Sequence, residues 1–200
     1  MEKPITEDEM NALPLRQFEG KITIVEEPKH VLFVMEYLSK FKAVGFDTET
    51  KPAFTKGTIN KVALVQISTN DSAFLFRINK MGVPSAIVEF LQNKNITKVG
   101  LAVRDDLRAL RSLRPFEPHG FVELQQLAKE KGYQDASLKK LAASVCEFRI
   151  SKRQRLTNWE APVLTPSQQI YAATDAWVTL QIFNKLIDSS PVVEHHSFQL

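Results

Sequence analysis

The stretch KAVGFDTET, residues 42–50, decides the fold of this chain. Its residues 43–46 are apolar and predict a short strand buried inside a sheet. Asp47 and Glu49 follow where this strand ends, two residues apart. Because strand side chains alternate between the two faces, both carboxylates leave the same face. Neighbouring carboxylates repel each other and are ligands that hard divalent cations prefer, so we expect a cation to bind here.

The segments on either side predict an α/β fold with a mixed sheet. VALVQIS (62–68) is almost entirely apolar, as in a strand buried on both faces, and AFLFRI (73–78) reads as its hairpin partner. TKVGLAV (97–103) predicts a further strand. Helical patterns cover residues 28–40, 84–93, 105–113, 123–131, 137–146 and 166–188, and a basic irregular stretch covers 149–163. Strands followed by strand–helix alternation and then helices are typical of this class.

Length and composition are those of one globular domain. Of the 200 residues, 44% are apolar and 24% charged, which suits a soluble protein with a full core. We expect a polar N-terminal lead-in at 1–19, one domain at 20–188 and a C-terminal tail at 189–200. The net charge of +3 permits a polyanionic partner without requiring one.

The sequence gives no sign of secretion or membrane insertion. Cys146 is the single cysteine, which excludes an intrachain disulfide, and we expect it to be a small buried residue. The first residues lack the pattern of a signal peptide, and no apolar run approaches the roughly 18 residues of a membrane span. We therefore expect a cytoplasmic protein without a membrane partner.

Further acidic residues occur in two later segments. Asp105 and Asp106 stand where a helix is expected to begin; one can cap the helix, which leaves the other free to face the cation site. Tyr171 and Asp175 are four residues apart on the final helix and therefore share a face. The structural alternative for Asp105 and Asp106 is a helix cap. For the final helix it is a half-buried Tyr171 and a solvent-facing Asp175. If the segments converge, they form a two-metal centre for Mg²⁺ or Mn²⁺, with the ions about 3.5–4 Å apart.

Three motifs resemble those of the DEDD superfamily of 3′–5′ exonucleases, which have a ribonuclease-H-like fold. They are FDTET (46–50), KVGLAVRDDLRAL (98–110) and YAATD (171–175). GTINKVALVQIS (57–68) and NWEAPVLTPSQQIYAATDAWVTLQIF (158–183) are also similar, so the resemblance covers roughly residues 40–188. The nearest subgroup is the Werner-syndrome exonuclease domain, with ribonuclease D more distant. Ile170 stands where the sister subgroup has His, so the chain resembles the tyrosine type.

The resemblance implies a set of roles for the acidic residues and the tyrosine. Asp47, Glu49, Asp106 and Asp175 would bind two divalent ions, and Tyr171 would orient or deprotonate the attacking water. Asp106 is chosen over Asp105 because the family's acid lies six residues after the glycine of the motif, here Gly100. The reaction implied is hydrolysis from the 3′ end, releasing nucleoside 5′-monophosphates. We favour the orienting role, because a tyrosine with a pKa near 10 is mostly protonated at neutral pH.

The substrate-binding residues and the choice of substrate are less strongly marked. Thr48 and Thr50 are expected near the terminal sugar, and Phe54 could stack on the terminal base. Four cationic side chains could contact phosphates, or could simply be solvated: Arg108, Lys152, Arg153 and Arg155. We interpret Asn158, Trp159 and Glu160 as structural.

The Werner-type resemblance favours a single-stranded DNA 3′ end as the substrate. Ribonuclease-D-like trimming of RNA is the alternative. An inactive nucleic-acid-binding module, or a scaffold that only contacts proteins, would have no physical reason to keep mutually repelling carboxylates.

Overall fold

A computed structural model describes residues 4–52, 60–135, 137–151 and 153–188. Its six-stranded sheet has the order β1-β4-β3-β2-β5-β6. The strands are β1 (Lys21–Val25), β2 (Ala43–Thr50), β3 (Val62–Ser68), β4 (Ser72–Phe76), β5 (Thr97–Gly100) and β6 (Phe121–Glu123). β3 runs antiparallel to both neighbours, whereas β1–β4, β2–β5 and β5–β6 are parallel pairs. The mixed sheet expected from the sequence is therefore confirmed.

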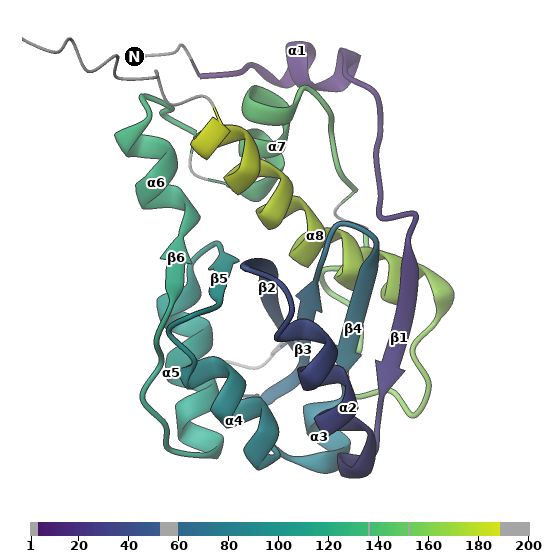
Figure 1. The fold of residues 1–200 in the computed structure, drawn as a ribbon. Helices are drawn as coiled ribbons and strands as arrows, with labels where there is room; N and C mark the ends of the chain where they lie inside the picture. The colour runs from purple at the N-terminus through teal and green to yellow at the C-terminus, as the bar shows by residue number, and fades with distance from the viewer. Residues whose placement is uncertain (1–3, 53–59, 136, 152, 189–200) are drawn as a thin grey trace, which may run out of the picture.

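Eight helices complete the described part of the fold. They are α1 (Glu7–Ala12), α2 (Pro28–Leu38), α3 (Ile78–Met81), α4 (Ser85–Gln92), α5 (Val103–Leu113), α6 (Leu124–Glu130), α7 (Leu138–Cys146) and α8 (Pro166–Asp188). In Figure 1, α8 crosses one face of the sheet, with α6 and α7 packed beside it, while α2, α4 and α5 lie on the opposite side. Within the described residues, no helix is long and apolar enough to span a membrane.

The apolar pattern of the central strands builds a core on each face of the sheet. Every residue of β3 is buried, as its nearly unbroken apolar run predicts. Val44 and Phe46 of β2 alternate onto the face that packs against α2, α4 and α5. The intervening β2 residues therefore face α8, and this is the face that carries Asp47 and Glu49.

A close approach between β2 and α8 sets the distance between these two elements. A Cβ atom at Gly45 would lie 1.8 Å from the backbone oxygen of Ala176, so only glycine fits here. On the same turn of α8, the Thr179 hydroxyl donates a hydrogen bond of 2.8 Å to the backbone oxygen of Val99 in β5. This packing brings the middle of α8 onto the exit of the central strands.

Several boundaries differ from the sequence prediction. β2 continues through Thr50, so Asp47 and Glu49 lie within the strand and pair with β3. The short elements β1, β6, α1 and α3 were not predicted, because each has too few residues to show a clear helix or strand period. The segment expected to be a polar lead-in contains α1 and buries Met10 and Phe18 almost completely. The expected tail at 189–200 lies outside the described residues.

Candidate active site

Three carboxylates from two elements meet where β2 passes beneath α8. Asp47 and Glu49 come from one face of β2, and Asp175 comes from α8. Each offers an oxygen atom, and these three atoms lie within 4.8 Å of one another. Asp175 is only 7% exposed, which excludes the alternative of a solvated surface Asp. The shared face predicted from the spacing of Asp47 and Glu49 is therefore present in the structure.

The electrostatics of this cluster favour a bound cation. Burial raises the pKa of Asp47 well above its ordinary value, and the charges of Asp175, Asp106 and Glu49 raise it further. Burial and the charges of Asp175 and Asp106 likewise raise the pKa of Glu49 to about 9. The positive charge of Arg155 lowers the pKa of Glu49, but it offsets only part of this rise. The cluster is thus short of positive charge.

Asp106 approaches β2 from the other side of the sheet. Its Oδ1 accepts a hydrogen bond of 2.5 Å from the hydroxyl of Thr48, whose side chain alternates away from those of Asp47 and Glu49. Burial raises the pKa of Asp106 to about 6, against the lowering effect of this hydrogen bond. Asp106 is not a member of the three-carboxylate group, although its charge raises the pKa of both β2 acids.

Asp105 and Asp106 occupy different environments, as the sequence spacing suggested. The side chain of Asp105 is 76% exposed and forms an ion pair of 3.0 Å with Arg108. Asp105 does not cap α5, however. That helix begins at Val103 after Ala102, which adopts the left-handed conformation with φ of 60°. Of the two roles open to Asp105, a helix cap or a solvated neighbour of Asp106, the cap is excluded because the helix starts two residues earlier, and the exposed side chain is the solvated neighbour.

Glu123 caps α5 instead, and sequence reasoning missed it. Its carboxylate accepts 2.9 Å hydrogen bonds from the backbone N–H groups of Ala102 and Val103. The negative charge also lies at the positive end of the helix. β6 places Glu123 beside the end of β5, so the contact depends on strand pairing and has no local sequence signal. Through this cap, Glu123 fixes the first turn of α5 and therefore the position of Asp106.

Tyr171 lies one turn before Asp175 on α8 and is 8% exposed. Burial, the charges of Asp175 and Glu49 and a hydrogen bond with Asp175 keep its pKa above the ordinary value. The phenol is therefore protonated at neutral pH and donates its O–H to the Asp175 carboxylate. Its ring contacts that of Trp159, with centroids 5.9 Å apart. Tyr171 and the three clustered carboxylates thus form one connected group.

The segment before α8 is anchored by buried side chains. Trp159 is fully buried and packs with Leu64 and Tyr171, consistent with the structural role expected for it. Sequence reasoning missed a second anchor, Arg77, whose buried guanidinium donates to the backbone oxygen of Ala161 and pairs with Glu26 at 3.3 Å. A single arginine after a strand carries no signal of burial, so only the fold reveals this contact.

The structure separates the expected substrate residues into several groups. Thr48 uses its hydroxyl to hold Asp106, and half-buried Thr50 ends β2 at a register shift. Arg108 is turned toward Asp105 in solvent, whereas Arg155 lies close enough to Glu49 to affect its pKa. Arg153 is exposed and lines a cavity that also includes Tyr171. Phe54 and Lys152 lie outside the described residues.

The donor set fits divalent cations such as Mg²⁺ or Mn²⁺. All the converging ligand atoms are carboxylate oxygens, which these hard ions prefer. The raised pKa values of Asp47 and Glu49 have the direction expected for acids whose positive counter-charge is missing. Asp47, Glu49 and Asp175 are therefore the residues best placed to hold an ion, with Asp106 beside them.

Comparison with known proteins is consistent with this chemistry. Residues 22–189 match a protein family described as 3′–5′ exonuclease. The chain is 35% identical over 198 residues to the mouse bifunctional 3′–5′ exonuclease/ATP-dependent helicase WRN, covering 93% of this chain and 14% of that protein. It is 27% identical over 148 residues to ribonuclease D of Cronobacter turicensis, covering 74% of this chain and 40% of the relative.

The fold is also shared with a solved ribonuclease. The crystal structure of Escherichia coli RNase D, described as an exoribonuclease involved in structured RNA processing, superimposes with a TM-score of 0.76 at 23% identity. The match covers 84% of this chain and 44% of that one. The ribonuclease-H-like architecture expected from the sequence is thereby confirmed. The chain spans less than half of the length of each of these three proteins.

Proposed function

The chain belongs to the 3′–5′ exonuclease family, whose members are hydrolases acting on nucleic acids, and on that premise we propose how its site works. It removes nucleotides one at a time from a single-stranded 3′ end, with DNA as the favoured polymer, and releases nucleoside 5′-monophosphates. Asp47, Glu49, Asp106 and Asp175 hold two divalent ions. The observation that carries this proposal is the meeting of three carboxylates beside Tyr171.

The residues of the chain divide the chemical work between them. Asp47, Glu49 and Asp175 hold the ions from two rigid elements, while Thr48 and Glu123 keep Asp106 in place. When bound, the ions supply activation of the attacking water and stabilisation of charge on the scissile phosphate. The Tyr171 hydroxyl, held protonated by its surroundings, orients that water by a hydrogen bond. Arg155 offsets part of the negative charge near Glu49.

Three observations bear on the choice between DNA and RNA. The motifs resemble the Werner-type domain more closely than ribonuclease D, and the 35% identity to the WRN protein against 27% to a ribonuclease D points the same way. RNA trimming is the second candidate, because the fold superimposes on an RNase D that is described as an exoribonuclease. Both reactions use the same acidic cluster, so the difference lies in contacts to the terminal sugar.

A cleavage assay on matched oligonucleotides tests the proposal. The substrates are 5′-labelled single strands of one sequence as DNA, as RNA, and as DNA ending in a single 3′ ribonucleotide, each with Mg²⁺ or Mn²⁺. We expect a ladder that shortens from the 3′ end, is abolished by EDTA and is fastest for DNA. Faster cleavage of RNA would replace the DNA preference with RNA trimming. The chimera shows whether the terminal sugar alone accounts for the preference.

Asp105 and Asp106 offer a matched pair of control variants. Both are Asp on the first turn of α5, but Asp105 is exposed and Asp106 is held by Thr48. We expect Asp106→Asn to lower kcat by about a hundredfold or more, because a metal ligand is lost. We expect the same of Asp175→Asn for the same reason. Asp105→Asn should stay within about twofold of wild type. Binding without cleavage of either polymer by the wild-type chain would indicate an inactive binding module instead.

A further inference from the structure

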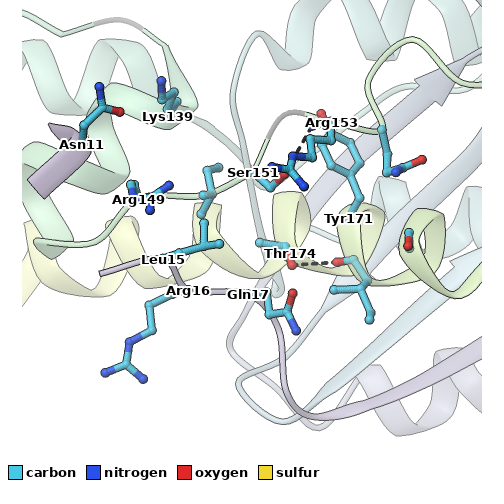
Figure 2. A pocket seen from close by; sticks show the side chains of 14 residues that line it. Asn11, Leu15, Arg16, Gln17, Lys139, Arg149, Ser151, Arg153, Tyr171 and Thr174 are labelled. Atoms are coloured by element: carbon cyan, nitrogen blue, oxygen red, sulfur yellow. Dashed lines mark hydrogen bonds between the residues drawn. The ribbon is translucent and has the colours of Figure 1, made fainter. Parts of the chain in front are cut away.

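A cavity of about 530 Å³ lies beside the acidic site and opens along one side of α8. Figure 2 shows its residues, with Arg153 and Tyr171 at one end and Asn11 and Lys139 at the other. One wall is formed by residues 11–17, which run from the end of α1 into the segment before β1 and which we call the N-terminal arm. The volume falls within the range of pockets that hold small ligands. Tyr171 belongs both to this cavity and to the acidic site.

The lining of this cavity is strongly cationic. The part of the lining that the structure describes includes Arg16, Lys139, Arg149 and Arg153 but no acidic side chain. Among the described residues, Arg16, Arg149 and Arg153 have no carboxylate oxygen within 4.0 Å, and only Lys139 forms an ion pair, with the exposed Glu7 at 3.5 Å. Several cations gathered in one hollow without counter-charges attract an anion. A ligand with more than one negative charge would match their distribution along the cavity.

Backbone and side-chain hydrogen bonds fix the N-terminal arm as a wall of this cavity. The N–H of Arg16 donates to the backbone oxygen of Arg149, and the N–H of Arg149 donates to that of Pro14, both at 2.9 Å. The Nε of Arg149 donates to the backbone oxygen of Leu13 at 3.0 Å. These contacts form a two-sided bridge between segments far apart in the sequence. The cavity is therefore preorganised, which lowers the cost of ordering it upon binding.

We propose that this cavity binds the sugar–phosphate backbone of the substrate strand on the 5′ side of the scissile bond. The inference rests on the proposed exonuclease function, because it extends the same site. A strand cleaved at its 3′ end leaves one nucleotide on one side of the bond and a row of phosphates on the other. The row of phosphates matches cations spread along a cavity, and a single terminal nucleotide does not. The N-terminal arm is then part of the substrate path.

Neutralising two cations from different segments of the lining tests this inference. The variant is Arg16→Gln with Lys139→Gln, and the matched control is Lys29→Gln with Lys94→Gln, which removes the same charge from α2 and from the loop before β5. Binding of a 5′-fluorescein single strand of about a dozen nucleotides is measured by anisotropy in EDTA, over roughly 50–200 mM KCl. We expect the Kd of the cavity variant to rise about five- to tenfold, with the control unchanged.

The salt dependence gives a readout that a folding defect would not produce. Each phosphate contact on a single strand contributes about 0.7 to the slope of log Kd against log salt, so losing two contacts should lower that slope by about 1.4. The loss of affinity should also be larger for the long strand than for a dinucleotide, which reaches less of the cavity. If the double variant melts early, Arg153→Gln is used alone, with half the change in slope expected.

The outcomes separate this inference from the proposed function. If the wild-type chain degrades the strand but the cavity variant keeps the wild-type Kd and salt slope, the cavity does not bind the backbone. If the wild-type chain cleaves neither polymer, while the cavity variant has a higher Kd and a lower salt slope, the binding role of the cavity is supported and the proposed nuclease function is rejected. Failure of the wild-type chain to bind the long strand at all would overturn the inference as well.

Discussion

At the scale of single residues, the acidic cluster holds charges together that would separate in an unfolded chain. Asp47, Glu49 and Asp175 are kept within reach of one another by a strand and a helix that are themselves buried. Their repulsion opposes folding unless a proton or a cation neutralises it. The free energy of unfolding should therefore respond both to pH and to metal, in a direction that the pKa shifts determine.

The first prediction concerns the pH dependence of the metal-free protein. Glu49 has an ordinary pKa of 4.5 and a folded-state pKa of about 9, so the folded state binds its proton more tightly than the unfolded state. The stabilisation is full below pH 4.5 and is lost as pH rises toward 9. We expect the free energy of unfolding in EDTA to fall between pH 5 and 8, by up to about 1.4 kcal/mol per pH unit for this one group.

Urea unfolding at several pH values, with EDTA or with Mn²⁺, measures this effect. Mn²⁺ should stabilise the protein more at pH 8 than at pH 5, because at low pH protons compete for the same oxygens. Glu49→Gln removes one of the titrating groups and should make the curve in EDTA less steep, while Asp47 and Asp106 still contribute. A metal-free stability that is constant across this range would show that the cluster is not neutralised by protons.

The second prediction concerns the hydroxyl of Tyr171. Tyr171→Phe keeps the ring against Trp159 and removes only the hydrogen-bond donor. We expect unchanged stability within about 1 kcal/mol and a kcat lowered by about ten- to a hundredfold, as for loss of a group that positions a reactant. Because the pKa of Tyr171 is raised, it should add no ionisation to the wild-type rate profile at neutral pH. Full activity in the variant would exclude the orienting role.

At the scale of elements, the sequence predicts which side chains share a face of one strand or one helix, because this depends only on the residue pattern within that element. The shared face of Asp47 and Glu49 follows from strand period, and the shared face of Tyr171 and Asp175 follows from helix period. Contacts between elements have no such pattern. Thr48 reaches Asp106, and Glu123 reaches the first turn of α5, only because the sheet and helix are packed together. These partners could not be found before the fold was known.

The third prediction concerns the cap that Glu123 provides. Glu123→Ala leaves the N–H groups of Ala102 and Val103 without their acceptor, so we expect a loss of about 1–2 kcal/mol in stability. Because the first turn of α5 carries Asp106, kcat should fall as well. Glu117→Ala is the control: Glu117 is exposed and its pairing distance to Arg111 is 3.7 Å, so it should cost under about 0.5 kcal/mol. Equal effects of the two substitutions would contradict the capping role.

At the scale of the whole molecule, the N-terminal segment is joined to both the fold and the cavity. The sequence presents residues 1–19 as polar, and their few apolar residues have no period that would predict burial. In the structure, Phe18 is 3% exposed and packs with Ala73 of β4 and with Ala173 and Trp177 of α8. Its N–H donates to the hydroxyl of Thr174 at 2.9 Å. Figure 1 shows this segment running beside α7 and α8 before it enters β1.

The N-terminal segment either unfolds together with the rest of the domain or opens on its own, and substitutions within it distinguish the two cases. If it unfolds with the domain, Phe18→Ala removes a buried aromatic side chain from the cooperative unit and should cost about 3 kcal/mol or more. Leu15→Ala, in the same segment but at a side chain that is 53% exposed, should cost under about 0.5 kcal/mol. The chain has two tryptophans, one beside Phe18 and one, Trp159, beside Tyr171. Single-tryptophan variants can therefore report on each region in urea.

Coincident transitions from the two tryptophans, both shifted by Phe18→Ala, would mean that the segment and the acidic site share one folding equilibrium. The cavity wall formed by the N-terminal arm would then be as persistent as the carboxylate cluster itself. A small loss of stability, with the Trp177 signal changing before that of Trp159, would mean that the segment opens locally. In that case the arm would leave its place along α8 while the site remained folded, and binding to the cavity would be penalised by the fraction of molecules in the open state.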